Sequence, residues 1–200
     1  FAGNPNIYYV DLSGNKFTGN IQFSNLPNFY DCYISSNNIT GITSFVGLSN
    51  LDKFIAGNNP NLTGAIPNFS VGSPRIRYIS LNNCKLNSYS AGRLNNATRL
   101  VSLDLSNNLL STSNVDQILT DLLANYNNAP RSGVQINLLG NAAPSRIVTN
   151  VPTQSVSIQT ENKTVAHQQP TPNFGPQPQR TITLTGTPVN IVAGKYLKQA

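Results

Sequence analysis

The side chains that could carry chemistry in this chain are few and lie far apart. Asp11, Asp31 and Asp104 alternate with apolar residues in short segments, so they are expected to project from one face of a sheet. A glycoside hydrolase needs two carboxyl groups about 5–10 Å apart in a cleft. Asp11 and Asp31 fall in neighbouring segments but one pair position out of line. This placement argues against glycosidase chemistry.

Other catalytic arrangements are also missing from the sequence. The single histidine, His167, lies in a stretch rich in proline and glutamine, where a general base would have no fixed partner. No group of Cys, His, Asp or Glu has metal-ligand spacing, and no glycine-rich loop could cradle a phosphate. The sequence therefore predicts a protein that is not an enzyme, with no catalytic residues, cofactor or metal.

The two cysteines are predicted to be free, buried thiols. Cys32 and Cys84 lie in segments that would be two strand spacings apart, or about 9–10 Å. A disulfide needs Cα atoms within about 7 Å. Core packing is therefore a better interpretation than redox or metal chemistry.

These residues are positioned by an internal repeat. Six segments share the spacing apolar-x-apolar-x-x-Asn, with Cys in place of Asn once. Their successive ends are 22, 22, 25, 24 and 33 residues apart. One such coil cannot bury its apolar face alone, so the copies predict a solenoid of stacked coils. The segments are 10–15, 32–37, 54–59, 79–84, 103–108 and 136–141.

The last position of each segment is predicted to form a structural ladder along the solenoid. An Asn amide both donates and accepts hydrogen bonds, so stacked copies can satisfy backbone groups where the chain turns inward. A cysteine can fill the same place as a small, weak donor. The ladder residues are Asn15, Asn37, Asn59, Cys84, Asn108 and Asn141.

The outward positions of the same segments are the candidate binding surface. Tyrosine gives stiff contact area with one polar end, so tyrosines among aspartates and small polar groups suit a glycan or a polar protein patch. The alternative is a solvated sheet face that binds nothing. The candidates are Tyr9, Asp11, Asp31, Tyr33, Lys53, Ile55, Tyr78, Asn82 and Asp104.

The longest interval is predicted to contain a helix. Apolar residues from Val115 to Tyr126 recur at helical spacing and form one stripe. Ser113 and Asp116 are spaced as a capping box at its start. We expect this helix to cover the convex side and to close the C-terminal end of the solenoid.

The repeat resembles the leucine-rich-repeat family, whose template is L-x-x-L-x-L-x-x-N/C-x-L. Segments 17–21, 39–42 and 62–67 resemble the L-T-G-x-I-P stretch of its plant-type branch. Secreted plant receptors and inhibitors usually carry paired cysteines in their caps, which this chain lacks. The Asn-rich turns, the helical unit and residues 136–144 are most similar to repeat segments in structural proteins of large tailed phages, especially cyanophage-like ones.

The resemblance covers residues 1–145 and implies an α/β solenoid. Its parallel β-sheet would line the concave face, with one C-terminal helix and a β-rich C-terminal arm. Residues 4–7 look like the entry to a repeat, so we expect something to precede or cover residues 10–12. The chain opens at Phe1 and not at Met, so we also expect it to be processed or trimmed.

Composition excludes several classes of partner. Of the 200 residues, 10% are charged, against about a quarter in typical domains, and the net charge is +6. The basic residues are scattered in the sequence, which argues against nucleic-acid binding. No apolar run approaches the roughly twenty residues of a membrane span. Polarity supplied by Asn, Ser, Thr and Gln favours an extracellular or virion-surface location.

The region after the repeats is predicted to serve assembly. Residues 146–180 form a partly extended, Pro/Gln-rich linker, and residues 181–200 form a β-strand arm. We expect the arm to add strands to another protein subunit, the alternative being an unordered tail. Deleting residues 166–200 should then abolish incorporation and leave the solenoid folded.

The sequence predicts a non-enzymatic interaction module. The preferred role is a structural or adhesive subunit of an extracellular assembly such as a phage particle, with a surface glycan or protein bound on the concave face. The alternative is a secreted leucine-rich-repeat receptor or inhibitor. Five Asn-x-Ser/Thr matches, beginning at residues 38, 61, 68, 96 and 162, would favour that alternative if they carry glycan.

Overall fold

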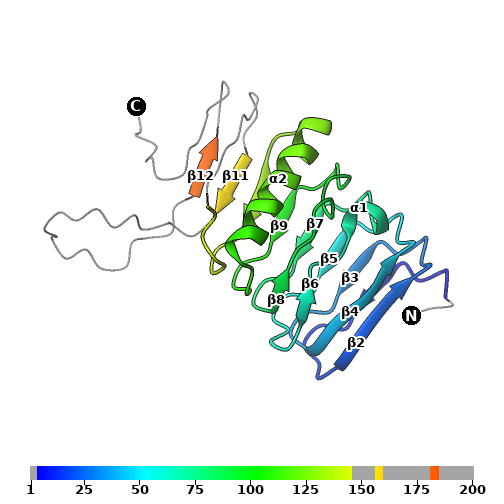
Figure 1. Ribbon diagram of the computed structural model, residues 1–200. Helices are drawn as coiled ribbons and strands as arrows, with labels where there is room; N and C mark the ends of the chain where they lie inside the picture. Colours follow the sequence, from blue (N-terminus) through cyan, green and yellow to red (C-terminus); the bar gives the residue numbers. More distant parts are fainter. Residues whose placement is uncertain (1–3, 146–155, 160–180, 185–200) are drawn as a thin grey trace, which may run out of the picture.

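The computed structural model describes residues 4–145 and two further strands, 156–159 and 181–184. The chain forms a parallel β-solenoid of about four turns (Figure 1). The predicted solenoid is therefore confirmed. Residues 146–155, 160–180 and 185–200, which include His167 and most of the expected linker and arm, lie outside the described residues.

One long sheet runs along the solenoid and takes one short strand from each turn. Equivalent residues stand side by side, since Tyr9 pairs with Asp31, Asp31 with Lys53, and Lys53 with Tyr78. The strands are three to four residues long because the chain bends away from the sheet between each strand and the ladder residue that follows it. In order they are β1 (Tyr9–Asp11), β3 (Asp31–Tyr33), β5 (Lys53–Ile55), β7 (Tyr78–Ser80), β9 (Ser102–Asp104) and β10 (Val134–Asn137).

The opposite side of the first four turns is also extended, which the sequence analysis did not predict. There β2 (Thr18–Ser24) pairs with β4 (Asn38–Val46), and β6 (Thr63–Ala65) pairs with β8 (Lys85–Ser88). These four strands form a second layer in front of the long sheet in Figure 1. The expected solenoid with a parallel sheet is therefore confirmed, and the described part of the chain is a β-solenoid with little helix.

The glycines that recur near the start of these strands have two physical causes. Gly19 and Gly64 have φ values of 79° and 88°, which favour glycine, as expected for a bend at the start of this side. Gly41 has an ordinary φ, but an added Cβ would lie 2.7 Å from Oδ1 of Asn20 on the neighbouring turn. Close packing of turns fixes Gly41, whereas backbone conformation fixes the other two.

The helix expected in the longest interval is present as α2 (Thr112–Asn128). It takes the place of the second strand, and its buried side includes Val115, Ile118 and Tyr126. Its N-cap is Ser111, whose side chain accepts a hydrogen bond from the backbone N of Asn114. The proposed capping box at Ser113 is therefore wrong. A second, short helix, α1 (Phe69–Gly72), lies in the third turn.

Replacing Ser111 with alanine should lower the free energy of unfolding by about 1 kcal/mol, because an N–H at the start of α2 loses its acceptor. Ser113→Ala should change it by less than about 0.5 kcal/mol, as is usual for an exposed site. Urea denaturation of both variants measures the difference. Equal losses would contradict the assignment of the N-cap.

The core at the N-terminal end of the solenoid is aromatic. Phe54 is fully buried, and its ring centroid lies 5.8 Å from that of Phe23, 4.9 Å from that of Phe45 and 6.1 Å from that of Phe69. The first two of these contacts are edge-on, a favourable arrangement for aromatic rings. Leucine and isoleucine fill the later turns. One apolar interior therefore joins all the turns.

Two more strands extend the long sheet past β10. β11 (Val156–Gln159) pairs with it in parallel, and β12 (Thr181–Leu184) pairs with β11 in antiparallel. The alternation predicted from residue 181 therefore does correspond to a strand. Strand addition to another subunit stays a prediction, as does a cover over residues 10–12, where Val10 and Leu12 are half-buried against the core.

Candidate functional site

The predicted ladder residues lie in file along one edge of the solenoid. Four of them donate from Nδ2 to a carbonyl of the preceding turn, and their Oδ1 accepts from a backbone N of that turn at 3.0–3.2 Å. Side chains thus bond to backbone, and the amides do not bond to each other. The donor pairs are Asn37 to Leu12, Asn59 to Ile34, Asn108 to Leu81 and Asn141 to Leu105, at 2.8–3.0 Å.

The two remaining rungs differ from these four. Asn15, in the first turn, is exposed and donates only within its own turn, to Leu12 and Ser13. Cys84 reaches the carbonyl of Ala56 through Sγ at 3.8 Å. The backbone N of Leu62, whose counterparts in other turns bond to a ladder amide, bonds instead to the carbonyl of Asn59. The ladder is therefore weakest at Cys84.

Both cysteines are free and buried, as predicted. Burial raises the pKa of Cys32 and of Cys84, so both thiols stay protonated at neutral pH. Because the thiolate is the reactive form, neither position suits nucleophilic or redox chemistry.

A second row of side chains, which the sequence analysis missed, stands one residue before the ladder. Asn58, Asn83 and Asn107 all have φ values between 53° and 57°, a conformation that asparagine tolerates. Here the amides bond to each other across turns, from Asn83 to Asn58 and from Asn107 to Asn83, at 2.8 Å each. The sequence does contain a signal for this row, because a small residue or an asparagine directly precedes each ladder position. These bonds fix the turn that ends each strand.

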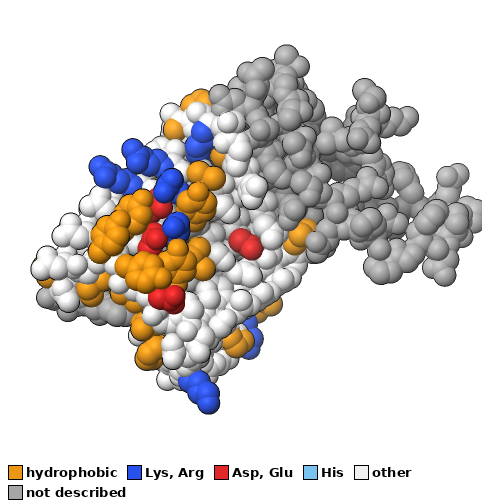
Figure 2. All heavy atoms as spheres, turned by 180° about the vertical axis from the view of Figure 1, so that it is seen from behind, with side chains coloured by type: hydrophobic (Ala, Val, Ile, Leu, Met, Phe, Trp, Pro, Cys, Tyr) orange, Lys and Arg blue, Asp and Glu red, His pale blue; other side chains and the backbone are white. Residues whose placement is uncertain are grey.

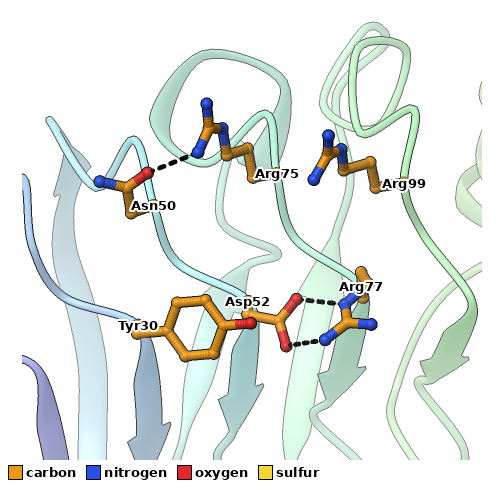
Figure 3. A pocket seen from close by; sticks show the side chains of 6 residues that line it. All are labelled: Tyr30, Asn50, Asp52, Arg75, Arg77 and Arg99. Carbon is orange, nitrogen blue, oxygen red and sulfur yellow. Dashed lines mark hydrogen bonds and ion pairs between the residues drawn. The ribbon is translucent and has the colours of Figure 1, made fainter.

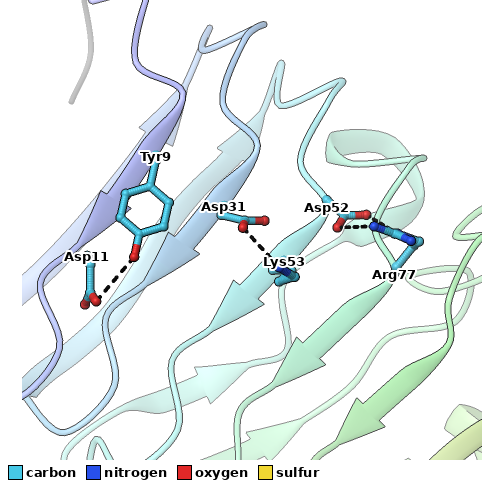
Figure 4. A network of polar contacts seen from close by, with 6 residues as sticks. All are labelled: Tyr9, Asp11, Asp31, Asp52, Lys53 and Arg77. Carbon is cyan, nitrogen blue, oxygen red and sulfur yellow. Dashed lines mark hydrogen bonds and ion pairs between the residues drawn. The ribbon is translucent and has the colours of Figure 1, made fainter.

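Eight of the predicted binding candidates lie in two rows on the outer face of the long sheet, and Figure 4 shows four of them, Tyr9, Asp11, Asp31 and Lys53. One row runs Tyr9, Asp31, Lys53 and Tyr78, and continues to Ser102. The other runs Asp11, Tyr33, Ile55 and Ser80, and continues to Asp104. Asn82 lies in the turn after β7 and accepts from Oγ of Ser80. Asp11 and Asp31 are not paired, in agreement with the predicted offset.

One ion pair and several hydrogen bonds hold the carboxylates of this face. Nζ of Lys53 lies 3.2 Å from Oδ2 of Asp31, and this hydrogen bond raises the pKa of Lys53. The other oxygen of Asp31 is buried and has no hydrogen-bond partner among the described residues. Asp11 accepts from the backbone N of Ser13, which lowers the pKa of its carboxyl. A buried oxygen without a hydrogen-bond partner, such as Oδ1 of Asp31, is rare in protein interiors.

Aromatic and charged side chains gather at one end of this face, as Figure 2 shows from behind. The ring centroids of Tyr9 and Tyr33 lie 5.6 Å apart. Toward the other end the rows continue as small polar residues, and that part of the face in Figure 2 is mainly white. We call the first group the outer-face patch; it consists of Tyr9, Asp31, Tyr33, Lys53, Ile55 and Tyr78.

A pocket of about 290 Å³, which the sequence analysis did not predict, adjoins the outer-face patch. It lies where the chain enters the strands, and we call it the arginine pocket (Figure 3). Its lining residues occupy two equivalent positions of successive turns, one and three residues before each strand. They are Tyr30, Asn50, Asp52, Arg75, Arg77 and Arg99.

Stacking of turns brings these arginines together although they are spread along the sequence. Arg75 and Arg99 are 24 residues apart, since 99 minus 75 is 24, which is about one turn. The basic residues are scattered along the sequence, but in the folded chain three arginines line one pocket. The sequence could have predicted this grouping, because Arg75 and Arg99 each lie three residues before a strand of the repeat.

One buried carboxylate organises the pocket. Asp52 is 4% exposed and accepts from Nε and Nη2 of Arg77, at 2.5 and 2.8 Å. This bidentate pair raises the pKa of Arg77, whose Cζ lies 5.4 Å from the ring centroid of Tyr78. Arg75 donates to Oδ1 of Asn50 at 2.9 Å. The guanidinium of Arg77 is therefore held in one orientation beside the open space.

Other kinds of site find no support in the described part of the chain. No three Cys, His, Asp or Glu residues come close enough there to hold a metal ion. None of the helices between residues 4 and 145 is long and apolar enough to cross a membrane. Comparisons with protein-family models, with curated proteins and with solved structures gave no match.

Proposed function

We propose that this chain is a non-enzymatic macromolecular-interaction module that binds a glycan or a polar protein surface through the outer-face patch. The observation that carries the proposal is the uneven distribution of side chains along one regular sheet. Tyrosines occupy β1, β3 and β7, whereas the same rows continue as Ser102 and Asp104 on β9 and as Gln135 and Asn137 on β10. A sheet face that served only solubility would need no such concentration of aromatic area.

The chemistry of the patch suits polar ligands. Tyr33 and Tyr78 are half-buried, so their rings are positioned while one side stays accessible. A tyrosine ring packs against the apolar face of a sugar or a side chain, and its hydroxyl hydrogen-bonds to polar groups. Asp31 and Lys53 lie between the tyrosine rings and supply further acceptors and donors.

We further propose that the solenoid is of the leucine-rich-repeat type, with the long sheet on its concave side. Support comes from the repeat length of 22–25 residues in the first four intervals and from the hydrogen-bonded Asn ladder. The plant-type L-T-G-x-I-P stretches supply the second-layer strands β2, β4 and β6. Similarity to repeat segments of phage structural proteins rests on the Asn-rich turns, on the helical unit and on residues 136–144.

Within that type, we propose a structural or adhesive subunit of an extracellular assembly, such as a phage particle, located outside the cell or on the virion surface. The arm of residues 181–200 would join it to other protein subunits. A receptor or inhibitor role is the second candidate, and it is favoured by the location of the outer-face patch on β1 to β7, away from β12 at the other end of the long sheet.

Two changes separate these roles. Combined Tyr33→Ala and Tyr78→Ala should abolish binding to a panel of surface glycans and proteins, whereas the exposed Val71→Ala, on α1, is the matched control. Deletion of residues 166–200 should leave the solenoid folded by circular dichroism but prevent incorporation into particles. A receptor would tolerate the deletion and lose only the tyrosine-dependent binding. Unchanged binding by the double variant would refute the proposed surface.

A further inference from the structure

We infer that the arginine pocket binds the anionic group, a carboxylate or a sulfate, of an acidic glycan, with the adjoining sugar ring against Tyr30. This inference rests on the proposed function and names the ligand class and the place of its charge. None of the binding candidates predicted from the sequence lines this pocket.

The charge of the pocket is unbalanced. Three arginines face one carboxylate, and that carboxylate is engaged by Arg77. Arg75 is exposed and bonds only to the neutral Asn50, while Arg99 is exposed and has no hydrogen-bond or ion-pair partner among the described residues. Two positive charges therefore remain uncompensated beside a pocket that is open to a ligand.

The geometry supplies donors on two sides of the same space. Figure 3 shows Asn50, Arg75 and Arg99 in one row, above a second row of Tyr30, Asp52 and Arg77. Arg77 uses two of its five N–H donors on Asp52, so three remain. Guanidinium groups bind the oxygens of carboxylates and of tetrahedral oxyanions through paired hydrogen bonds, which lysines cannot match.

Arg77 is held in place before any ligand arrives. Its bidentate bond to the buried Asp52 and its place over the ring of Tyr78 restrict the orientation of the guanidinium. A group that is already ordered loses less conformational entropy on binding. Asp52 therefore acts as a positioning residue for Arg77.

The residues that line the pocket favour an acidic sugar over an acidic protein surface as the ligand. Among the lining residues none is aliphatic, whereas protein interfaces depend on buried apolar or aromatic anchors. Tyr30 offers an aromatic ring that is already stacked, 5.2 Å from the ring of Tyr8, and so is fixed as a platform. A pocket of about 290 Å³ is small for a ligand site and fits one charged ring.

A nucleic acid fits less well, because the positive region is short. A duplex carries one negative charge per roughly 1.7 Å and is bound by many phosphate contacts. Here the equivalent positions of the preceding turns are Asn28 and Asn50, and the register of β10 with β9 makes Ser132 the counterpart of Arg99. The adjacent Arg131 is engaged by the carbonyl of Leu100 and by Oδ1 of Asn125. The arginines therefore form a point of contact and not a track.

The test is binding of the full chain to polysaccharides of defined charge at low ionic strength. Polygalacturonate carries carboxylates, dextran sulfate carries sulfates, and dextran is neutral. We expect one or both acidic polymers to bind, and dextran to bind more weakly. Combined Arg75→Gln and Arg99→Gln should weaken that binding at least tenfold. Tyr30→Leu should weaken it severalfold, since stacking is lost.

The matched control removes the same charge elsewhere: Lys16→Gln with Lys85→Gln, both exposed and outside the pocket. This control should bind as the unmodified chain does, and equal weakening would overturn the inference in favour of a general charge effect. DNA and polyglutamate are included as probes. Equal or tighter binding of either, lost in the arginine variant, would overturn the glycan assignment.

The inference and the proposed function fail in different ways. If the arginine variant keeps full binding while Tyr33→Ala with Tyr78→Ala loses it, the outer-face patch binds but the arginine pocket does not. If the unmodified chain binds neither acidic polymer, the inference is wrong, and the proposed function is decided by the wider glycan and protein panel.

Discussion

Asn59→Ala is expected to lower the free energy of unfolding by about 3–5 kcal/mol. Asn59 is fully buried, and its amide donates to the carbonyls of Ile34 and Ala56 while its Oδ1 accepts from the backbone N of Ile39. Alanine leaves these groups without partners in an interior that water cannot reach. Each such group costs about 1–3 kcal/mol.

The matched control for this result is Asn15→Ala. Asn15 holds the same ladder position in the first turn, but it is exposed, and water can replace the bonds to Leu12 and Ser13. We expect a loss below about 1 kcal/mol. Denaturant titration followed by circular dichroism measures both variants. Similar losses at the two positions would show that burial of the amide does not govern the stability of the ladder.

Phe54→Ala is expected to cost about 3–5 kcal/mol, because it removes a fully buried ring and leaves a cavity that the turns cannot close. The ring packs against phenylalanines from other turns, Phe23 in the first and Phe45 in the second, and against Phe69 in its own turn. Loss of this ring therefore weakens contacts between turns and not only within one.

Phe17→Ala serves as the control for the same change of side chain. Phe17 is 47% exposed and belongs to the first turn, so its removal should cost about 1 kcal/mol or less. Thermal and denaturant unfolding should rank the two variants clearly. A loss at Phe54 as small as that at Phe17 would mean that the aromatic cluster does not join the turns.

Stability of this interior has a direct consequence for binding. Tyr33 and Lys53 alternate along short strands with the core residues Cys32 and Phe54, so one backbone positions both faces. A strand that lost its inner contacts would also misplace its outer side chains. The outer-face patch and the arginine pocket therefore depend on the same stacking of turns.

Features set by the repeating pattern could be predicted from the sequence. Alternation of apolar residues placed Leu103 inside and Asp104 outside, and the repeat length placed Asn37, Asn59 and Asn108 in file. These predictions hold because each depends on the chain within one turn and on stacking of identical units. The same reasoning gave two unpaired cysteines and the helix of the longest interval.

Other features were decided only by the tertiary structure. The arginine pocket joins residues from neighbouring turns, and their grouping follows from register between strands, as with Lys53 beside Tyr78. The Asn58–Asn83–Asn107 row and the strands of the second layer depend on the same contacts between turns. Local pattern states which way a side chain points within its turn, whereas stacking decides which side chains meet, because partners lie 22–25 residues apart.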